Sequence, residues 1–517
     1  MQTRKLPVDL AIHRTSDARH RLPRMFGTGQ LVVLGLGVMI GAGIFSLSGQ
    51  QAAKNAGPAV ILSFVIAAVV CFVAALCYAE LSSTIPVAGS VYTFSYVAFG
   101  EFWAWLVGWA LILELVVAAA LVSRAWSAYF LTTIDGLGFG VPSGVARFGA
   151  FDAEVNLIAP VVLLLLTALV VTGTKLSARV LTVAVIGKVA VILLVIVVGA
   201  GHVKADNYKP FVPSLKAVPD GEGTGSLLQA IIGDTTTSFG PFGVFAAASV
   251  ITFAYIGFDL IATAAEDTKD PRHSIPRAML ISLGLVTLLY VAMATVLVGL
   301  RPFSELGTDA PVPDALEAVG VSWAALVVNL GGLLAFTTVI MVVLIAQSRV
   351  LFAMGRDGLL PQGLGRVSSV FSAPSRAAAT AGIAATLLAL YPRIGSLEEL
   401  LVIGTLAAFF SCAVGVVRLR RAQPDLERGF RVPASPILPL LSALATTWLA
   451  LNLSVHTWRN FAVWTAIGIA IYFAYGRSRS VLAELESNPA PEGNQPIPDA
   501  APAWSDPVPR IRGKHAR

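Results

Sequence analysis

Long apolar runs alternate with short polar segments along almost the whole chain. The runs are about 17 residues long or longer, the length that a helix needs to cross a hydrocarbon core about 30 Å thick. This pattern predicts an all-α polytopic membrane protein with 12 transmembrane helices. The predicted ranges are 29–52, 57–81, 100–132, 155–173, 178–200, 241–265, 278–300, 322–352, 376–392, 396–418, 435–454 and 459–476.

Composition agrees with this interpretation and excludes others. The 517-residue chain is 56% apolar and 13% charged, and its mean hydropathy is +0.77, unlike an ordinary soluble domain. The net charge of +6 does not indicate nucleic-acid binding, because the basic residues lie mainly between the apolar runs. Cys71, Cys77 and Cys412 all fall inside predicted spans, without the spacing of a disulfide framework or a metal site.

The basic residues predict the orientation of the chain. On the side of the N-terminus, 22 Lys and Arg residues lie in or next to the connecting segments, against 8 on the opposite side. Because cytoplasmic segments carry an excess of Lys and Arg, we expect both termini in the cytoplasm. The first 24 residues are polar, so they do not resemble a cleavable signal peptide.

The first span has an unusual centre. It reads VMIGAGIF over residues 38–45, with glycine at positions 41 and 43, although glycine costs roughly 0.8–1.0 kcal/mol relative to alanine inside a helix. Either the helix is interrupted there, or another segment packs closely against it, for which the GxxxG spacing of Gly37 and Gly41 is suited.

The sixth span is unusual in the same way. Tyr255, Gly257 and Asp259 interrupt its apolar run, and an ionisable side chain at that depth is rare unless it faces a cavity or a partner. Five spans separate the starts of the two unusual helices, and an odd number of spans inverts the second unit relative to the first. Such paired interruptions are typical of inverted-repeat transporters. The sequence therefore predicts a 5+5 inverted repeat with discontinuous helices 1 and 6, plus two extra helices.

This scheme divides the chain into six segments. They are a cytoplasmic N-terminal segment (1–28), a first inverted repeat (29–200), an outer loop (201–240), a second inverted repeat (241–418), the two extra helices (419–480) and a disordered cytoplasmic tail (481–517). The outer loop is expected to lie as a cap over the outer mouth.

Two interrupted helices meeting at the membrane midplane predict a site for an α-amino acid. Each interruption frees backbone N–H groups at one half-helix end and C=O groups at the other, and in hydrocarbon these groups need partners. A helix N-terminus suits a carboxylate. We predict that the carboxylate binds the N–H groups around Gly41, Ala42, Gly43 and Ile44, and that the ammonium binds the carbonyl groups of Met39, Phe253, Ala254 and Ile256.

Five motifs, taken in order, resemble a known family. They are IGAGIF (40–45), GEFWAWLVGWALILELVVAAA (100–120), FAYIGFD (253–259), TAAEDTKDP (263–271) and AMGRDGLLP (353–361). Together they are similar to the cationic amino acid transporter branch of the amino acid, polyamine and organocation (APC) superfamily, over roughly residues 25–480. The resemblance implies a LeuT-type fold, alternating access, proton-driven amino acid uptake and a bacterial inner membrane.

Ionisable residues deep in the spans are candidates for proton coupling. Lys188 lies about 13 Å into the fifth span, too deep for its ammonium group to reach either surface easily. In proton-coupled relatives, a lysine at the matching place is thought to stand in for a sodium ion. A permanent contact with carbonyl groups of the first span is the alternative. Glu114 is equally deep in the third span, where a pair with Lys188 or another cation, a proton relay and a bracing role all remain open.

Other side chains complete the predicted site. Asp259 is a candidate gate, with capping of the second half-helix as the alternative. The resemblance to the superfamily implies that Phe253 is a further gate, whose ring swings over the ligand. Thr337 and Thr338 of the eighth span are expected to line the pocket for the substrate side chain. Ion pairs at the cytoplasmic end are expected from Glu80, Glu266, Asp267, Lys269 and Asp270.

The chain shows no enzyme motif such as HExxH, a GxSxG with partners or GxxxxGK[ST], and nothing in it indicates a cofactor or a metal. The leading hypothesis is a proton-coupled amino acid symporter of the plasma membrane, whose partners are the amino acid, the proton and the lipid bilayer. A sodium-coupled symporter, an amino acid or polyamine exchanger and a sensor without net transport are the alternatives. The side-chain preference stays open.

Overall fold

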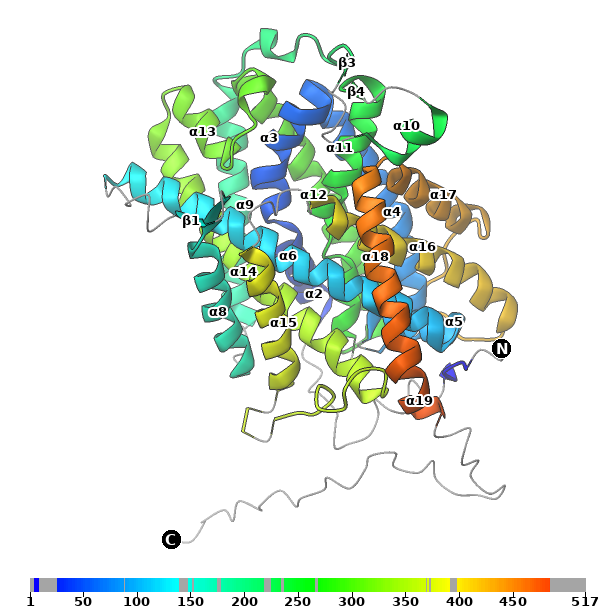
Figure 1. The fold of residues 1–517 in the computed structure, drawn as a ribbon. Coiled ribbons are helices and arrows are strands. Elements are labelled where there is room, and N and C mark those ends of the chain that lie inside the picture. The colour runs from blue at the N-terminus through cyan, green and yellow to red at the C-terminus, as the bar shows by residue number, and fades with distance from the viewer. Residues whose placement is uncertain are drawn as a thin grey trace, which may run out of the picture.

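A computed structural model of the chain is mostly helical (Figure 1). It describes residues 4–8, 26–87, 89–138, 147–150, 153–173, 178–217, 225–233, 237–265, 268–368, 370–371, 373–390 and 398–483. Four short strands form two antiparallel pairs in this part of the chain. They are β1 (Arg147–Ala150) with β2 (Ala153–Asn156), and β3 (Lys216–Ala217) with β4 (Thr237–Ser238).

Helices occur in every range that the apolar pattern predicts. The uninterrupted ones, with the short helices between them, are η3 (Gly57–Ala59), α4 (Val60–Thr84), α5 (Ser90–Ala98), α6 (Glu101–Gly136), α8 (Ile158–Val171), α9 (Ala178–Ala200), η4 (Ala205–Tyr208), α10 (Leu227–Ile232), α12 (Pro271–Leu300), η6 (Phe303–Glu305), α13 (Pro311–Ala318), α14 (Ser322–Arg356), α15 (Ser375–Ala389), α16 (Glu398–Ala422), α17 (Ile437–Leu451), α18 (Val455–Ile471), η8 (Tyr472–Gly476) and α19 (Arg477–Arg479).

Both predicted interruptions are present. The first half of the first predicted span is α2 (Thr28–Met39). The helix resumes after three residues as a π-helical turn, η1 (Gly43–Leu47), followed by α3 (Ser48–Gln51) and η2 (Ala52–Ala56). The sixth predicted span is α11 (Gly240–Tyr255), which is followed after three residues by the 3₁₀ helix η5 (Asp259–Ala264). Each of the two helices is therefore split close to its middle.

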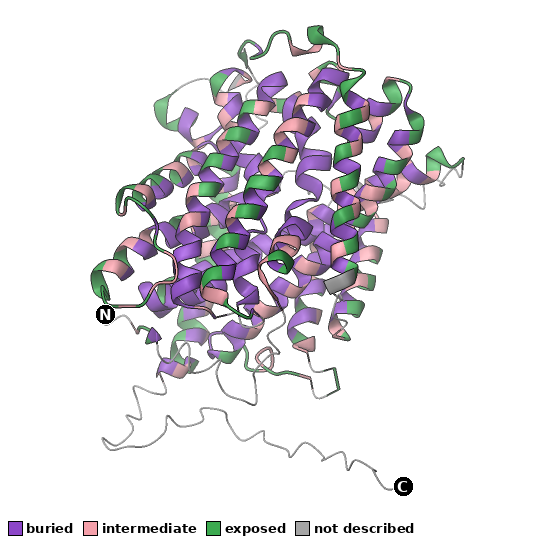
Figure 2. Ribbon diagram, turned by 180° about the vertical axis from the view of Figure 1, so that it is seen from behind, coloured by how far each residue is buried: buried purple, intermediate pink, exposed green. Residues whose placement is uncertain are grey.

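Seven helical stretches among the described residues are long and apolar enough to cross a membrane. They are Gly43–Thr84, Glu101–Gly136, Val180–Ala200, Gly240–Ala264, Pro271–Leu300, Ser322–Arg356 and Glu398–Ala422. Buried residues fill the interior and exposed ones lie mainly outside (Figure 2). Outward-facing apolar side chains such as Val183, Val197 and Leu288 are about 70% exposed (69%, 73% and 70%), as expected where lipid is the solvent. The chain is a polytopic membrane protein, and the count of 12 crossings stays a prediction.

The long helix α6 crosses the bundle obliquely (Figure 1) and packs against α14, α16 and α18. Its contact with α18 is a reciprocal tryptophan pair. Trp109 Nε1 donates to Trp464 O at 2.8 Å and Trp464 Nε1 to Trp109 O at 3.0 Å, with the two rings stacked 4.5 Å apart. Because buried indole N–H groups need acceptors, this pairing fixes α18 onto α6.

The two ends of the bundle differ. At the upper end of Figure 1, α13 lies beside α3, where Gln50 Nε2 donates to Thr308 O at 3.3 Å. The 201–240 segment, predicted as the cap, sends α10 to the start of α18, with Leu227 N donating to Leu453 O at 2.9 Å. Its other described parts reach the upper end of the first interrupted helix, where Pro213 lies against Gly57 and β4 packs against η2. Both α13 and the 201–240 segment therefore lie against this helix, and the role of 201–240 as a cap stays a prediction.

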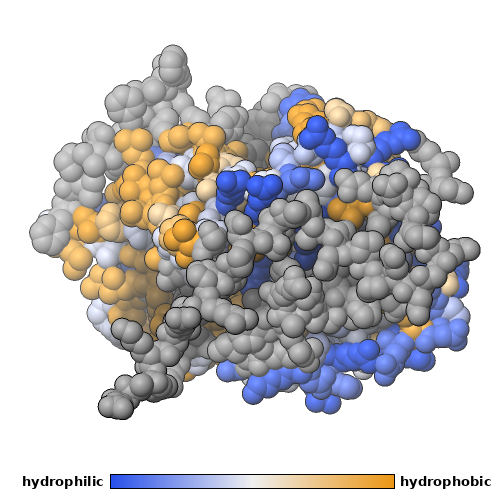
Figure 3. All heavy atoms as spheres, turned by 90° about the horizontal axis from the view of Figure 1, so that it is seen from below, coloured by the Kyte–Doolittle hydropathy of each residue, from blue (hydrophilic) through white to orange (hydrophobic). Residues whose placement is uncertain are grey.

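At the lower end of the bundle, Glu80 forms the predicted ion pairs. It is buried, accepts a 2.7 Å hydrogen bond from Arg420 Nε, and lies 3.5 Å from Arg428 Nε. Glu266 and Asp267 lie outside the described residues. Seen from below, hydrophilic and apolar residues gather in separate areas of this end (Figure 3).

Candidate functional site

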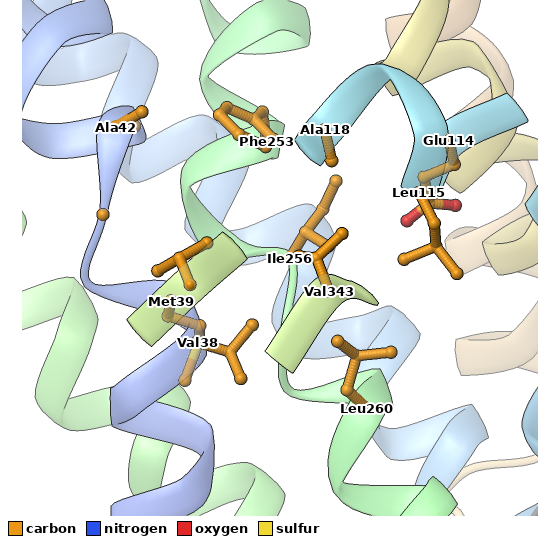
Figure 4. A pocket seen from close by; sticks show the side chains of 13 residues that line it. Val38, Met39, Ala42, Glu114, Leu115, Ala118, Phe253, Ile256, Leu260 and Val343 are labelled. Atoms are coloured by element: carbon orange, nitrogen blue, oxygen red, sulfur yellow. The ribbon is translucent and has the colours of Figure 1, made fainter. Parts of the chain in front are cut away.

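The two interruptions face each other inside the bundle (Figure 4). A Cβ atom added to Gly43 would overlap the Cα and Cβ atoms of Ala254, so the two backbones touch at this point. A Cβ on Gly41 would lie 2.9 Å from Val339 Cγ2 of α14. Both interpretations of the glycines therefore hold, because the helix is interrupted and its glycines also permit close packing.

The first interruption presents backbone donors. Ile40 is extended, with φ −74° and ψ 97°. Ile44 N and Phe45 N both donate to Gly41 O at 3.3 Å, so the new half-helix begins at Gly41. The first N–H groups of a helix have no partner within it. Those of Gly41, Ala42 and Gly43 are in this position. The Ile44 N–H, which was predicted to bind the carboxylate as well, already donates to Gly41 O.

The second interruption is held open by an acidic side chain. Ile256 is extended (ψ 133°) and Gly257 has φ 131°, a conformation that favours glycine. Asp259 Oδ1 accepts the Gly257 N–H at 3.0 Å, and the side chain is 3% exposed. Asp259 therefore bridges the turn before η5 without making a side-chain cap hydrogen bond to η5 itself, and the capping alternative stays a prediction. Its role as a gate stays a prediction.

Lys188 and Tyr290 hold the carbonyl groups at the end of α2. Lys188 is fully buried and its Nζ donates to Gly37 O at 2.7 Å and to Ile40 O at 3.1 Å. Tyr290 Oη of α12 donates to Met39 O at 2.5 Å. Met39 O, predicted to bind the ammonium, thus already has one donor, and its second lone pair is the one left for substrate. Tyr290 was not predicted; a hydroxyl in the middle of an apolar span was the available signal.

A small cavity lies between the interruptions and α6. Its volume is about 20 Å³, and it is lined by Val38, Met39, Gly41, Ala42, Gly43, Glu114, Leu115, Ala118, Phe253, Ile256, Leu260, Val339 and Val343. Figure 4 shows Phe253 near Ala118, and Glu114 beside Leu115 on α6. Most of the residues whose backbone groups are predicted to bind the substrate thus line one cavity. Ile44 and Ala254 are buried but are not among its lining residues.

Glu114 is the one acidic side chain lining the cavity. It is 1% exposed, and its Oε2 atom has no hydrogen-bond partner in the part of the chain that the structure describes. No ion pair joins it to Lys188 among the described residues, because the Lys188 ammonium group contacts α2 instead. The two residues proposed for proton coupling therefore approach the interruption from different elements, α6 and α9.

Thr337 and Thr338 do not line the cavity. Thr337 Oγ1 donates to Leu333 O at 2.7 Å and accepts Trp126 Nε1 at 2.9 Å, and Thr338 Oγ1 donates to Ala335 O at 2.9 Å. The cavity instead meets Val339 and Val343 of the same helix. The two threonines therefore lie on another face of α14 than the cavity-lining valines, because each residue rotates the face by about 100°, and their contact with a substrate stays a prediction.

An aromatic cluster above the cavity was not predicted. The rings of Phe45, Tyr129 and Phe336 make edge-to-face contacts, with centroids 5.0 to 6.4 Å apart. Tyr129 Oη also donates to Phe45 O at 2.6 Å. These residues come from η1, α6 and α14, and only their convergence in space distinguishes them from ordinary apolar positions.

Long apolar helices, two interrupted helices and a buried cavity between them together define a polytopic membrane protein of transporter type. Residues 26–472 match the family described as amino acid permease. The chain therefore belongs to the amino acid permease family, within the APC superfamily, and the resemblance seen in the motifs is confirmed.

Relatives in this family have different names. The methylthioribose transporter of Bacillus subtilis is 40% identical over 463 residues, which cover 89% of this chain and 95% of that protein. The branched-chain amino acid permease BcaP of the same organism is 40% identical over 484 residues, covering 93% and 98%. The vacuolar cationic amino acid transporter 2 of Arabidopsis thaliana is 34% identical over 411 residues, covering 78% and 61%. The chain is thus similar to permeases and transporters.

Proposed function

We propose that this chain is a secondary active transporter that carries an α-amino acid into the cell together with a proton. The observation that carries the proposal is the pair of facing interruptions. The N–H groups of Gly41, Ala42 and Gly43 lie at one side of a buried cavity and the extended segment at Ile256 lies at the other. An α-amino acid has one carboxylate and one ammonium, which match these two kinds of group.

The side-chain pocket favours an aliphatic substrate. Leu115, Leu260, Val339 and Val343 contribute the aliphatic wall, and burial of apolar surface is worth about 25 cal/mol per Å². The name of the branched-chain permease BcaP is consistent with such a pocket. Leucine is therefore the first substrate to test, with arginine as the alternative that the cationic relatives suggest.

Transport by this site requires alternating access. A cavity of about 20 Å³ holds about one water-sized molecule, so the half-helices must part to admit an amino acid. We assign the upper end of Figure 1 to the outside and the lower end to the cytoplasm, with 12 membrane crossings, the 5+5 inverted repeat and both termini inside. The excess of basic residues on the lower side supports this orientation.

Proton coupling is assigned to Lys188, with Glu114 as a second carrier. The ammonium group of Lys188 joins α9 to the end of α2 through Gly37 O and Ile40 O. A neutral lysine keeps fewer donors for these carbonyl groups, so the change in protonation alters the contact between α9 and the first interruption. In this way a proton and the movement of α2 are linked.

Uptake into proteoliposomes tests the proposal. Radiolabelled leucine should accumulate when an inwardly directed pH gradient is imposed in sodium-free buffer, and a proton ionophore should abolish the accumulation. Lys188→Ala should lose concentrative uptake. Lys204→Ala removes an exposed lysine instead and should behave as wild type.

Each alternative has its own result. Accumulation that needs sodium indicates a sodium symporter, and flux that needs substrate on the opposite side indicates an exchanger. Binding without any flux indicates a sensor. Undiminished proton-driven uptake by Lys188→Ala removes this residue from the coupling mechanism.

A further inference from the structure

Two buried amide side chains of α14 have polar atoms without hydrogen-bond partners among the described residues. Gln347 is 1% exposed, and neither its Oε1 nor its Nε2 is hydrogen-bonded within this part of the chain. Asn329 is 2% exposed, and its Oδ1 has no partner there either. Buried polar atoms nearly always have a partner, because an unmade hydrogen bond is costly. These amide atoms are therefore available to a ligand that reaches α14.

The two amides share one face of α14. They are eighteen residues apart, which is about five turns of 3.6 residues and about 27 Å along the helix axis. Val343 lies four residues before Gln347, close to the same face, and it lines the central cavity. The cavity thus lies between the two amides, with Asn329 toward the upper end of the bundle and Gln347 toward the lower end.

On the upper side, the aromatic cluster separates Asn329 from the cavity. Phe336 follows Asn329 by seven residues, about two turns along the same face. Its ring contacts both Tyr129 and Phe45, and Tyr129 Oη is bonded to Phe45 O. Parting these rings opens the way between Asn329 and the substrate site.

On the lower side, the cavity ends in apolar residues. Figure 4 shows Val38 and Leu260 on the side of the cavity opposite Ala42 and Phe253. Arg349, two residues beyond Gln347, ties α14 to η5 by a 3.3 Å hydrogen bond from Nη1 to Thr263 O. Movement of α2 and η5 away from α14 opens the way between Gln347 and the site.

We infer that Asn329 and Gln347 are two further substrate contacts, one on each approach to the central site. This inference rests on the proposed transport of an α-amino acid. An amide has both a donor NH₂ group and an acceptor oxygen, so it can bond to the carboxylate and to the ammonium of the same substrate. Asn329 meets the amino acid when the outer side is open, and Gln347 meets it when the inner side is open.

Side-specific kinetics test the inference. Leucine entry is measured in right-side-out and in inverted membrane vesicles that contain the full chain. Gln347→Met keeps the length of the side chain and removes its amide; it should raise the KM at the cytoplasmic side by about tenfold, as for one lost hydrogen bond. Asn329→Leu should raise the KM at the outer side by a similar factor. Each variant should keep the KM of the opposite side within about twofold of wild type.

Asn452 provides the matched control. It is also a buried asparagine whose Oδ1 has no partner among the residues that the structure describes, but it lies at the end of α17. Asn452→Leu should therefore leave both KM values unchanged. If Gln347→Met is not recovered as folded protein, Gln347→Asn is the second variant, because it shortens the side chain and so moves the amide away from the substrate. It should show the same increase of the KM at the cytoplasmic side alone.

Two results would overturn the inference while wild type transports leucine. Either each α14 variant changes both KM values equally, or both values stay unchanged. Absence of amino acid flux in wild type would instead refute the proposed function, and the inference with it.

Discussion

The contact between Gly43 and Ala254 supports a quantitative prediction about substrate binding. A methyl group added at Gly43 falls on the Cα and Cβ atoms of Ala254. The Cα atom belongs to the backbone of α11, so it cannot rotate away as the end of a flexible side chain can. Gly43→Ala must therefore push the two half-helices apart, and the donors of η1 then move away from the extended segment after α11.

The expected size follows from the cost of overpacking. Inserting one methyl group into a well-packed site costs typically about 1–3 kcal/mol. If the bound state carries this cost, the affinity for leucine falls by about 5-fold to 150-fold. Gly43→Leu adds a larger side chain at the same point and is expected to abolish binding without preventing membrane insertion.

Equilibrium binding of radiolabelled leucine to purified protein measures this effect, with size-exclusion chromatography as the check on folding. Gly284→Ala is the matched control, because Gly284 lies in α12 and a Cβ atom added there has no neighbour within 4 Å. It should bind as wild type does. Retained affinity in a folded Gly43→Ala protein would contradict the account of the facing interruptions.

Three further changes have distinct expected outcomes. Tyr290→Phe removes the donor to Met39 O and should weaken leucine binding by about tenfold. Unchanged affinity in the same binding assay would show that this hydrogen bond does not contribute to substrate binding. Glu80→Gln should lower the free energy of unfolding by roughly 2 kcal/mol. This loss is smaller than that for breaking a fully buried ion pair, because the Arg420 side chain is 27% exposed. A thermal-shift midpoint equal to that of wild type would contradict this. Val343→Ala removes two methyl groups from the cavity wall and so enlarges the cavity. It should raise the ratio of kcat/KM for phenylalanine to kcat/KM for valine by about tenfold. An unchanged ratio in uptake assays would show that Val343 does not limit the size of the substrate side chain.

The interruptions were predictable because they break a strong local rule. Glycines at 41 and 43, and Asp259 after Gly257, are unexpected in uninterrupted lipid-crossing helices, and both helices are indeed split at these points. Lys188 was visible for the same reason. Its contact with Gly37 O and Ile40 O matches the alternative that ties it to the first span.

The face that each helix turns toward the cavity was much less predictable. The helix α14 is apolar almost all round, so the pattern of its residues does not show which face is inward. Threonines at 337 and 338 looked suitable for a pocket, yet Val339 and Val343 line it. The same limit applies to Phe45, Tyr129 and Phe336, because three separate elements must be assembled before their rings meet.

Loop length predicts only part of the outer surface. The 201–240 segment is the longest connection on its side of the predicted membrane. It reaches the first interrupted helix, where Pro213 lies against Gly57, and through α10 the turn between α17 and α18. The shorter connection that contains α13 covers α3, where Pro311 meets Gly49. Length alone therefore did not indicate that a second connection also lies over the interrupted helix.

Competition by substrate analogues tests the central claim most directly. The claim is that the two interruptions recognise the carboxylate and the ammonium of one α-amino acid. Unlabelled leucine should displace radiolabelled leucine from the purified protein, whereas 4-methylpentanoate, 3-methylbutan-1-amine and methylthioribose, each of which lacks one or both of these groups, should not. Displacement by the analogues as effective as displacement by leucine would contradict the claim.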